Sequence, residues 1–102
     1  MNSFVSELGM KNTSFKDASG LSYENVSNSA DLFKLAQYMY KNEKSILSIT
    51  KNSNYSLASS TDHQAHKYKA IDPFVLDPHF LGGKTGRTIE AKESMISMFN
   101  YS

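Results

Sequence analysis

The pattern of apolar residues changes at Pro78, and this change limits the possible fold more than any other feature of the sequence. Before it, apolar residues recur mainly at helical spacing, and Pro73 and Pro78 keep the segment that they bracket out of a long helix. After it, residues 80–88 and 94–101 are typical of two strands, joined by a polar turn at 89–92. Helices followed by a terminal hairpin predict an α+β fold.

The clearest helix runs from about Ser29 to Lys41. One apolar stripe at positions i, i+3, i+4 and i+7 predicts its buried face, and this stripe is formed by Leu32, Leu35, Ala36 and Met39. Ser29 can cap the helix, and Asp31 places a carboxylate in the first turn, where the helix dipole favours negative charge. The stripe indicates a packing face and not a ligand site.

A short helix is expected at the N-terminus, where three apolar residues share one helical face: Phe4, Val5 and Leu8. Gly9 can take the left-handed conformation that ends this helix, and Met10 then packs back against it. Residues 11–28 are rich in Asn, Thr, Ser and Gly, so they predict an irregular connection.

Weaker patterns lie on either side of the two prolines. A second short helix is predicted within residues 42–51, with three apolar residues buried: Ile46, Leu47 and Ile49. An irregular strand is predicted around Tyr55 and Leu57. In the terminal hairpin, a strand with both faces largely covered is indicated by Met95, Ile96, Met98 and Phe99.

The composition is that of an ordinary globular segment. The chain has 102 residues, enough for one small domain, with 39% hydrophobic and 21% charged residues. Its net charge of +1 indicates neither a nucleic-acid surface nor a membrane surface. The absence of cysteine excludes disulfides and thiolate metal sites. No apolar run approaches the roughly 20 residues of a membrane-spanning helix.

Residues 82–88, with the sequence GGKTGRT, put a cation, hydroxyl groups and bare backbone side by side. The triplet Lys84-Thr85-Gly86 is one of three signatures of the penicillin-binding and serine β-lactamase enzymes. The other two signatures are Ser-x-x-Lys, which carries the nucleophile, and Ser-x-Asn. Both precede the triplet in those enzymes.

Further pieces precede the triplet in a fixed order, namely Met1-Asn2, Leu8-Gly9-Met10, Thr13, Phe15, Gly20-Leu21 and Ser29–Leu32. Together with residues 83–88 they resemble the serine D-alanyl-D-alanine carboxypeptidases, the low-molecular-mass penicillin-binding proteins of peptidase family S11. The resemblance implies a partial β-lactamase/transpeptidase-like fold, with helices followed by an antiparallel hairpin. It also implies that residues 1–102 are the C-terminal portion of one catalytic domain, without the half that carries the nucleophile. Because the hairpin would belong to a larger sheet, its apolar residues are expected to be partly exposed.

The resemblance also implies roles for the residues around the triplet. In this family a serine attacks the D-Ala-D-Ala peptide and expels the terminal D-alanine, and water hydrolyses the acyl-enzyme. Catalytic roles fall to Lys84, as a fixed positive charge, and to Arg87, whose backbone N–H contributes to the oxyanion hole. Substrate binding falls to Thr85, whose hydroxyl meets the terminal carboxylate, to Gly86, which leaves room for the substrate backbone, and to Thr88, which supports the carboxylate site.

The implied substrate is a peptidoglycan stem peptide ending in D-Ala-D-Ala, and the whole enzyme would bind β-lactams. The resemblance implies no cofactor and a location outside the cytoplasm, at the bacterial cell envelope. Because the Ser-x-x-Lys motif that carries the nucleophile and the Ser-x-Asn motif are both missing from this portion of the implied catalytic domain, the chain alone is expected to be inactive. The alternative is a non-catalytic binding or structural half-domain, from a degenerate or split relative.

Other motif matches favour ordinary structural roles. Ser48-Ile49-Thr50-Lys51 matches Ser-x-x-Lys literally, but it lies too close to the triplet and without Ser-x-Asn between them, so an ordinary helix residue is expected at Ser48. Gly83-Lys84-Thr85 resembles the end of a phosphate-binding loop, but Pro78 stands where that loop needs glycine.

The chain offers few metal ligands. His63 and His66 are spaced i, i+3 beside Asp62, and the remaining histidine is His79, so no metal site is predicted. The turn carboxylates Glu90 and Glu93 lie next to Lys92 and are expected to be solvated.

Overall fold

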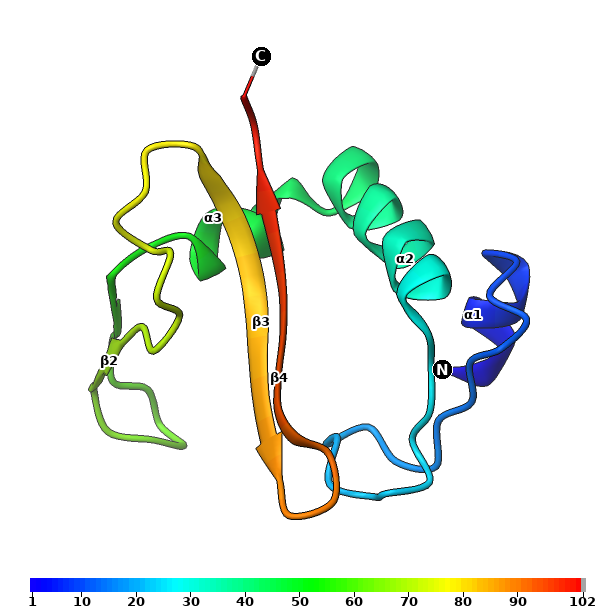
Figure 1. The fold of residues 1–102 in the computed structure, drawn as a ribbon. Helices are drawn as coiled ribbons and strands as arrows, with labels where there is room; N and C mark the ends of the chain where they lie inside the picture. Colours follow the sequence, from blue (N-terminus) through cyan, green and yellow to red (C-terminus); the bar gives the residue numbers. More distant parts are fainter. Residues whose placement is uncertain (102) are drawn as a thin grey trace. The chain divides into compact units, whose positions relative to one another are not determined.

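The computed structural model describes residues 1–101 and confirms the α+β class (Figure 1). The elements are, in chain order, α1 (Asn2–Glu7), α2 (Ser29–Asn42), α3 (Lys44–Thr50), β1 (Asn54–Leu57), β2 (His66–Lys69), β3 (Phe80–Thr88) and β4 (Lys92–Phe99). The four strands form two sheets of two strands each, β1–β2 and β3–β4. The chain divides into two compact units, residues 1–44 with 87–93, and residues 45–86 with the chain from 94 onward. None of the helices within residues 1–101 combines the length and apolarity needed to cross a membrane.

Helix α1 ends as the sequence predicts. Gly9 follows the helix with φ +73°, the left-handed conformation that glycine adopts without a steric penalty. The Gly9 N–H donates to the Ser6 carbonyl at 3.0 Å, and the Met10 N–H donates to the Val5 carbonyl at 2.9 Å. This pair of bonds satisfies carbonyls that a helix end would leave unpaired. Val5 and Met10 are both buried, so the reversal of the chain also supplies core contacts.

The irregular connection 11–28 is ordered by side-chain acceptors. The Asp17 carboxylate accepts hydrogen bonds from the Gly20 and Ser22 N–H groups, both at 2.7 Å, and from the Asn25 side chain at 3.1 Å. The hydrogen bond from Asn25, together with the backbone donors, lowers the pKa of Asp17. A loop without a ladder of backbone hydrogen bonds thus satisfies its polar groups locally.

Helix α2 is capped one residue earlier than predicted. Asn28 is the N-cap, because its backbone is extended and its side-chain oxygen accepts the Asp31 N–H at 2.8 Å. Ser29 already lies in the first helical turn, so its predicted capping role is wrong. The predicted stripe is only half-buried at each of its positions, Leu32, Leu35, Ala36 and Met39.

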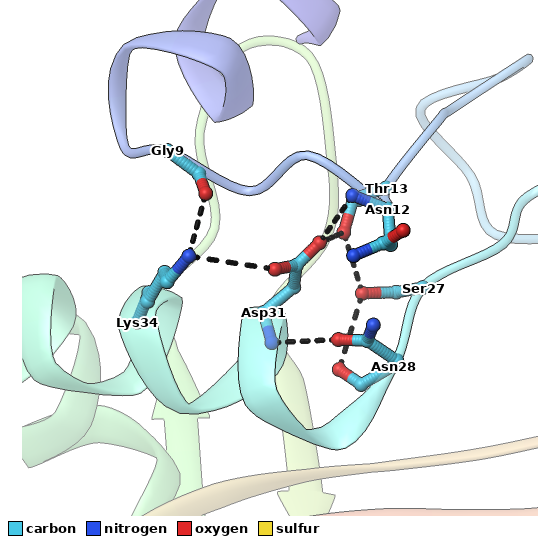
Figure 2. A network of polar contacts seen from close by, with 7 residues as sticks. All are labelled: Gly9, Asn12, Thr13, Ser27, Asn28, Asp31 and Lys34. Atoms are coloured by element: carbon cyan, nitrogen blue, oxygen red, sulfur yellow. Dashed lines mark hydrogen bonds and ion pairs between the residues drawn. The ribbon is translucent and has the colours of Figure 1, made fainter.

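The most deeply buried group on α2 is a carboxylate, that of Asp31, whose residue is 2% exposed. Figure 2 shows its oxygen Oδ2 accepting the Asn12 N–H and the Thr13 hydroxyl, both at 2.8 Å. The Lys34 ammonium lies 3.7 Å from Oδ1 and donates to the Gly9 carbonyl at 2.6 Å. The first turn of α2 is therefore joined to the chain that follows α1 through one ionised side chain. The sequence predicted only the favourable interaction of Asp31 with the helix dipole.

The network determines the protonation behaviour of Asp31. Burial alone would raise the pKa of this carboxyl group. The hydrogen bonds from Thr13 and Asn12 and the positive charge of Lys34 oppose that effect and lower the pKa below its ordinary value. Folding therefore favours the ionised form of Asp31.

Helix α3 buries less than its sequence predicts. Leu47 is 7% exposed, whereas Ile46 and Ile49 are 46% and 47% exposed. A helix of seven residues presents only one narrow face to its neighbours, so the predicted burial of both isoleucines is wrong. The predicted strand around Tyr55 and Leu57 is confirmed as β1, which pairs antiparallel with β2. The sequence did not predict β2, because its residues are polar or amphipathic and all exposed.

The terminal hairpin matches the prediction closely. Strand β3 has the predicted bounds, and β4 begins at Lys92 and ends at Phe99, two residues earlier than predicted at each end. Phe80 is buried, and its ring packs against that of Phe99, with centroids 5.8 Å apart. The expected partial exposure is confirmed, because Met95 is 46% exposed and the apolar residues after it on β4 are half-buried. The prediction that both faces of this strand are largely covered is therefore wrong, since β4 has no fully buried residue.

One residue of the hairpin has an unfavourable backbone conformation. Lys92 has φ +57° at the start of β4, in the left-handed region that glycine and asparagine tolerate better than lysine. We expect Lys92→Gly to raise the free energy of unfolding by about 0.5 kcal/mol, because relief of the steric strain exceeds the added entropy of the unfolded chain. Urea unfolding followed by circular dichroism measures this change.

Ala91→Gly is the matched control for Lys92→Gly, because residue 91 lies in the same turn without a positive φ. We expect Ala91→Gly to lower the free energy of unfolding by about 0.5 kcal/mol, through chain entropy alone. Equal effects of the two substitutions would contradict the assignment of strain to Lys92.

A second prediction concerns acid stability. A carboxyl group whose pKa is lowered by folding stabilises the fold fully above its unfolded pKa, and the contribution is lost as the pH falls through the folded pKa. We therefore expect the free energy of unfolding to decrease below about pH 4. Asp31→Asn should reduce this decrease, and Asp62→Asn, in the exposed loop before β2, is the control. Urea unfolding at a series of pH values tests this, and an unchanged acid dependence in Asp31→Asn would contradict it.

Candidate functional site

All five predicted site residues lie on the single strand β3, which Figure 1 shows as one arm of the terminal hairpin. Lys84, Gly86 and Arg87 are exposed, whereas Thr85 and Thr88 are half-buried. The strand therefore presents the triplet and the two residues after it in one extended segment. It does not bury them as core residues.

A pair of glycines precedes the triplet, and at Gly82 the strand contacts a helix through bare backbone. Gly82 has φ +143°, and a Cβ atom at this position would lie 2.6 Å from the Thr50 hydroxyl oxygen and 3.0 Å from the Leu47 carbonyl oxygen. Such distances leave no room for a side chain. The last turn of α3 thus packs directly against the backbone of β3, immediately before Lys84.

The second glycine is enclosed by a different part of the structure. A Cβ atom at Gly83 would lie 2.5 Å from the Ile96 carbonyl oxygen of β4 and 3.1 Å from the Asp72 carboxylate oxygen Oδ2. Asp72 is 9% exposed, and its other oxygen accepts the Phe74 N–H at 2.9 Å. Oδ2 has no hydrogen-bond partner among the described residues. Asp72 therefore orders the loop before β3 while it fills the space beside Gly83.

A hydrogen bond across the strand edge shows which way the backbone of β3 faces. The Gly83 N–H donates to the Thr50 hydroxyl oxygen at 3.3 Å. In an antiparallel strand the backbone groups of alternate residues point to the same edge. By this alternation we expect the Thr85 N–H to face the same edge as the Gly83 N–H, and the N–H groups of Lys84 and Gly86 to face the opposite edge.

The Lys84 ammonium lies beside the backbone of the triplet, where it donates to the Thr85 carbonyl. Within residues 1–101 no carboxylate lies within ion-pair distance of it. An exposed cation without a neighbouring anion attracts a bound carboxylate. At the far end of the strand, an open hollow beside the hairpin turn is lined by Arg87, Thr88, Ile89, Lys92 and Glu93.

The structure gives ordinary roles to several alternative residues. The Ser48 hydroxyl lies on α3 and donates to the Ser45 carbonyl at 2.7 Å, as expected of a helix residue. Gly83, Lys84 and Thr85 continue as a strand, whereas a phosphate-binding loop would lead into a helix. Glu90 and Glu93 are exposed, in agreement with the prediction.

The histidines do not gather with other ligands. The rings of His63 and His66 lie with their centroids 6.0 Å apart, and His79 contacts Asp77, with Nδ1 and Oδ1 separated by 3.2 Å. Over the described part of the chain, no three His, Cys, Asp or Glu side chains converge on a point that could hold a metal ion.

Sequence reasoning missed two residues that shape this site, Thr50 and Asp72. The available signal was the Gly82-Gly83 pair, because adjacent glycines in a strand indicate close approach of another backbone. That signal does not name the approaching residues. Thr50 is separated from the pair by more than 30 residues, and only the folded structure brings them together.

Comparison with known protein families identifies a family that covers nearly the whole chain. The family model described as Peptidase S11, D-alanyl-D-alanine carboxypeptidase, matches residues 1–100. No curated protein matches the chain. The matched range includes α1, α2 and the whole of β3 and β4, so the ordered motifs of the sequence and the strand described above lie within it.

The crowding around Gly83 predicts unequal effects of alanine at two glycines of β3. Gly83→Ala should lower the free energy of unfolding by about 2 kcal/mol, because the new methyl group would overlap the Ile96 carbonyl. Gly86→Ala should change it by less than about 1 kcal/mol, since its Cβ atom would lie 3.4 Å from the Ser94 hydroxyl, an ordinary contact. Urea unfolding of both variants tests this, and equal effects would show that the packing is not specific to Gly83.

Proposed function

Because the chain belongs to the peptidase S11 family of D-alanyl-D-alanine carboxypeptidases, we propose that it supplies the substrate-binding strand of a serine-type enzyme that trims peptidoglycan stem peptides by acyl transfer. The observation that carries this proposal is the exposed triplet Lys84-Thr85-Gly86 on β3, inside the matched range. The family match supports a hydrolase of the peptidase class. The roles of individual residues below are part of the proposal.

The terminal carboxylate of a D-Ala-D-Ala peptide would bind at Lys84 and Thr85. Lys84 supplies a positive charge that no carboxylate of residues 1–101 neutralises, and Thr85 supplies a hydroxyl donor. A charge-assisted hydrogen bond of this kind is shorter and about twice as strong as a neutral one. Thr88 would support this site from the end of the strand. The binding of a free carboxylate at this point would select peptides at their C-terminus.

The backbone N–H of Arg87 would stabilise the oxyanion that forms when a serine attacks the peptide carbonyl. The place of Arg87 on β3, directly after the triplet, supports this role. Removal of one oxyanion donor typically costs about 3–4 kcal/mol of transition-state stabilisation. Gly86, which has no side chain, would allow the substrate backbone to lie against the strand.

The nucleophile would come from a segment that carries Ser-x-x-Lys and Ser-x-Asn. In the acyl-transfer step its serine oxygen would bond to the penultimate D-alanine carbonyl, the peptide bond would break, and the terminal D-alanine would leave with a proton on its nitrogen. Water would then hydrolyse the ester. The same serine would be acylated by β-lactams, and the substrate requires a location outside the cytoplasm.

A second candidate function is a non-catalytic half-domain that binds or supports another chain. The observation that favours it is the exposed triplet on β3, which could bind a carboxylate without a nucleophile on the same segment. In that case the strand would retain its fold and its affinity for a carboxylate, but no acyl-enzyme would form when the nucleophile segment is supplied.

The proposal predicts that Lys84→Ala weakens binding of N-acetyl-D-Ala-D-Ala by about tenfold, because a charged partner of the carboxylate is lost. Amide chemical shifts of the labelled chain, titrated with the peptide, measure this affinity. Lys69→Ala, on the exposed strand β2, is the control and should bind like the parent chain. The peptide with an amidated C-terminus should bind weakly to every variant.

A reconstitution experiment separates the two candidate functions. The chain is mixed with a segment of an S11 enzyme that carries the nucleophilic Ser-x-x-Lys and the Ser-x-Asn motif, and a fluorescent penicillin is added. If the chain is part of an enzyme, we expect the fluorescent penicillin to label the mixture that contains the parent chain, and to label the mixture with Lys84→Ala less. Peptide binding without labelling would favour the non-catalytic half-domain. Equal affinity of the peptide and its amide would contradict the proposed carboxylate site.

A further inference from the structure

Thr50, the last residue of α3, makes two hydrogen bonds with one hydroxyl group. It donates to the Leu47 carbonyl at 3.1 Å and accepts the Gly83 N–H at 3.3 Å. The first bond fixes the side-chain rotamer, because it ties the hydroxyl to the preceding helical turn. The second then offers an oriented acceptor to β3. Thr50 is half-buried, so these bonds are partly shielded from water.

The helix end fits β3 only at the position where Thr50 meets the glycine pair. A Cβ atom at Gly82 would lie within 2.6 Å of the Thr50 oxygen and 3.2 Å of the Leu47 Cα atom. A shift of the strand by one residue would bring Leu81 or Gly83 to this point. Leu81 could not enter, and Gly83 would lose its hydrogen bond. The contact therefore fixes the position of β3 along its own direction.

The hydrogen bond from Gly83 to Thr50 also occupies one backbone N–H group on the edge of β3. The Gly83 N–H is bonded to Thr50, and the alternation of a β-strand directs the Thr85 N–H to the same edge. A peptide that pairs with this edge would therefore meet its first unoccupied N–H group at Thr85, the proposed carboxylate-binding threonine.

We propose that Thr50 is a positioning residue for the acyl-transfer site: its hydroxyl sets the placement of β3 from Gly83 to Gly86, and with it the position of the Thr85 hydroxyl. This inference rests on the proposed function of β3. Thr50 touches no substrate in this scheme. It acts through Gly83, one residue before the triplet.

The test compares Thr50→Val, which keeps the shape of the side chain and removes the hydroxyl, with Thr50→Ser, which keeps the hydroxyl. Hydrogen exchange of the Gly83 amide in the whole chain is measured first. We expect Thr50→Val to raise its exchange rate about tenfold at an unchanged melting temperature, and Thr50→Ser to resemble the parent. Thr61→Val, at an exposed loop position, is the matched control.

The second measurement is the affinity for N-acetyl-D-Ala-D-Ala, followed at the Thr85 and Arg87 amides. We expect about fivefold weaker binding in Thr50→Val and recovery in Thr50→Ser. If Thr50→Val exchanges the Gly83 amide faster but binds the peptide as tightly as the parent chain, Thr50 has only a structural role and the proposal is overturned. An unchanged exchange rate of the Gly83 amide in Thr50→Val would also overturn it. If the parent chain does not bind the peptide, the proposed carboxylate-binding site on β3 is wrong. The exchange rates of the Gly83 amide still show in that case whether the Thr50 hydroxyl stabilises the position of β3.

Discussion

The direct backbone contact between the last turn of α3 and the glycine pair of β3 is the constraint on which the candidate site depends. Close approach of this kind leaves no side chain to adjust, so the distance between helix and strand is set by hard-sphere contact. The hydroxyl of Thr50 adds a direction to that contact, because a hydrogen bond requires the Gly83 N–H to face it. Position and direction together place Lys84 and Thr85, although neither residue touches α3 in any hydrogen bond described.

The unit of residues 1–44 and 87–93 is stabilised mainly by polar contacts, whereas the contact of α3 with β3 depends on close backbone packing. Its buried apolar residues within the described chain are Val5 and Met10, while the most buried group on α2 is ionised. A buried carboxylate without partners would destabilise the fold, but Asp31 accepts two hydrogen bonds and faces Lys34. Those partners are directional, so they fix where the chain after α1 meets α2. Apolar contacts alone would fix this position less strictly.

The sequence predicts those features of the fold that depend on neighbouring residues. The bounds of β3, the end of α1 at Gly9 and most of α2 follow from periodicity and from turn residues, which act over a few positions. The role of Asp31 could not be predicted, because its partners Asn12 and Thr13 lie in a separate irregular segment. The same applies to Thr50, whose helix-end hydroxyl has no distinctive pattern. The triplet itself was recognisable because its chemistry is concentrated in consecutive residues and because further motifs precede it in the order found in the family.

The edge of β3 illustrates how the exposed length of a strand can be limited. An exposed strand edge pairs with any extended chain, because its N–H and C=O groups recognise backbone and not sequence. At one end of β3, the bond from Gly83 to Thr50 removes a pairing position. At the other, the chain turns at residues 89–91 and enters β4 with Lys92 in a left-handed conformation that breaks the extended backbone. The pairing edge is thereby limited to a few residues around Thr85. In the proposed function, such a short edge would bind the end of a peptide beside Lys84 without offering a long surface for aggregation.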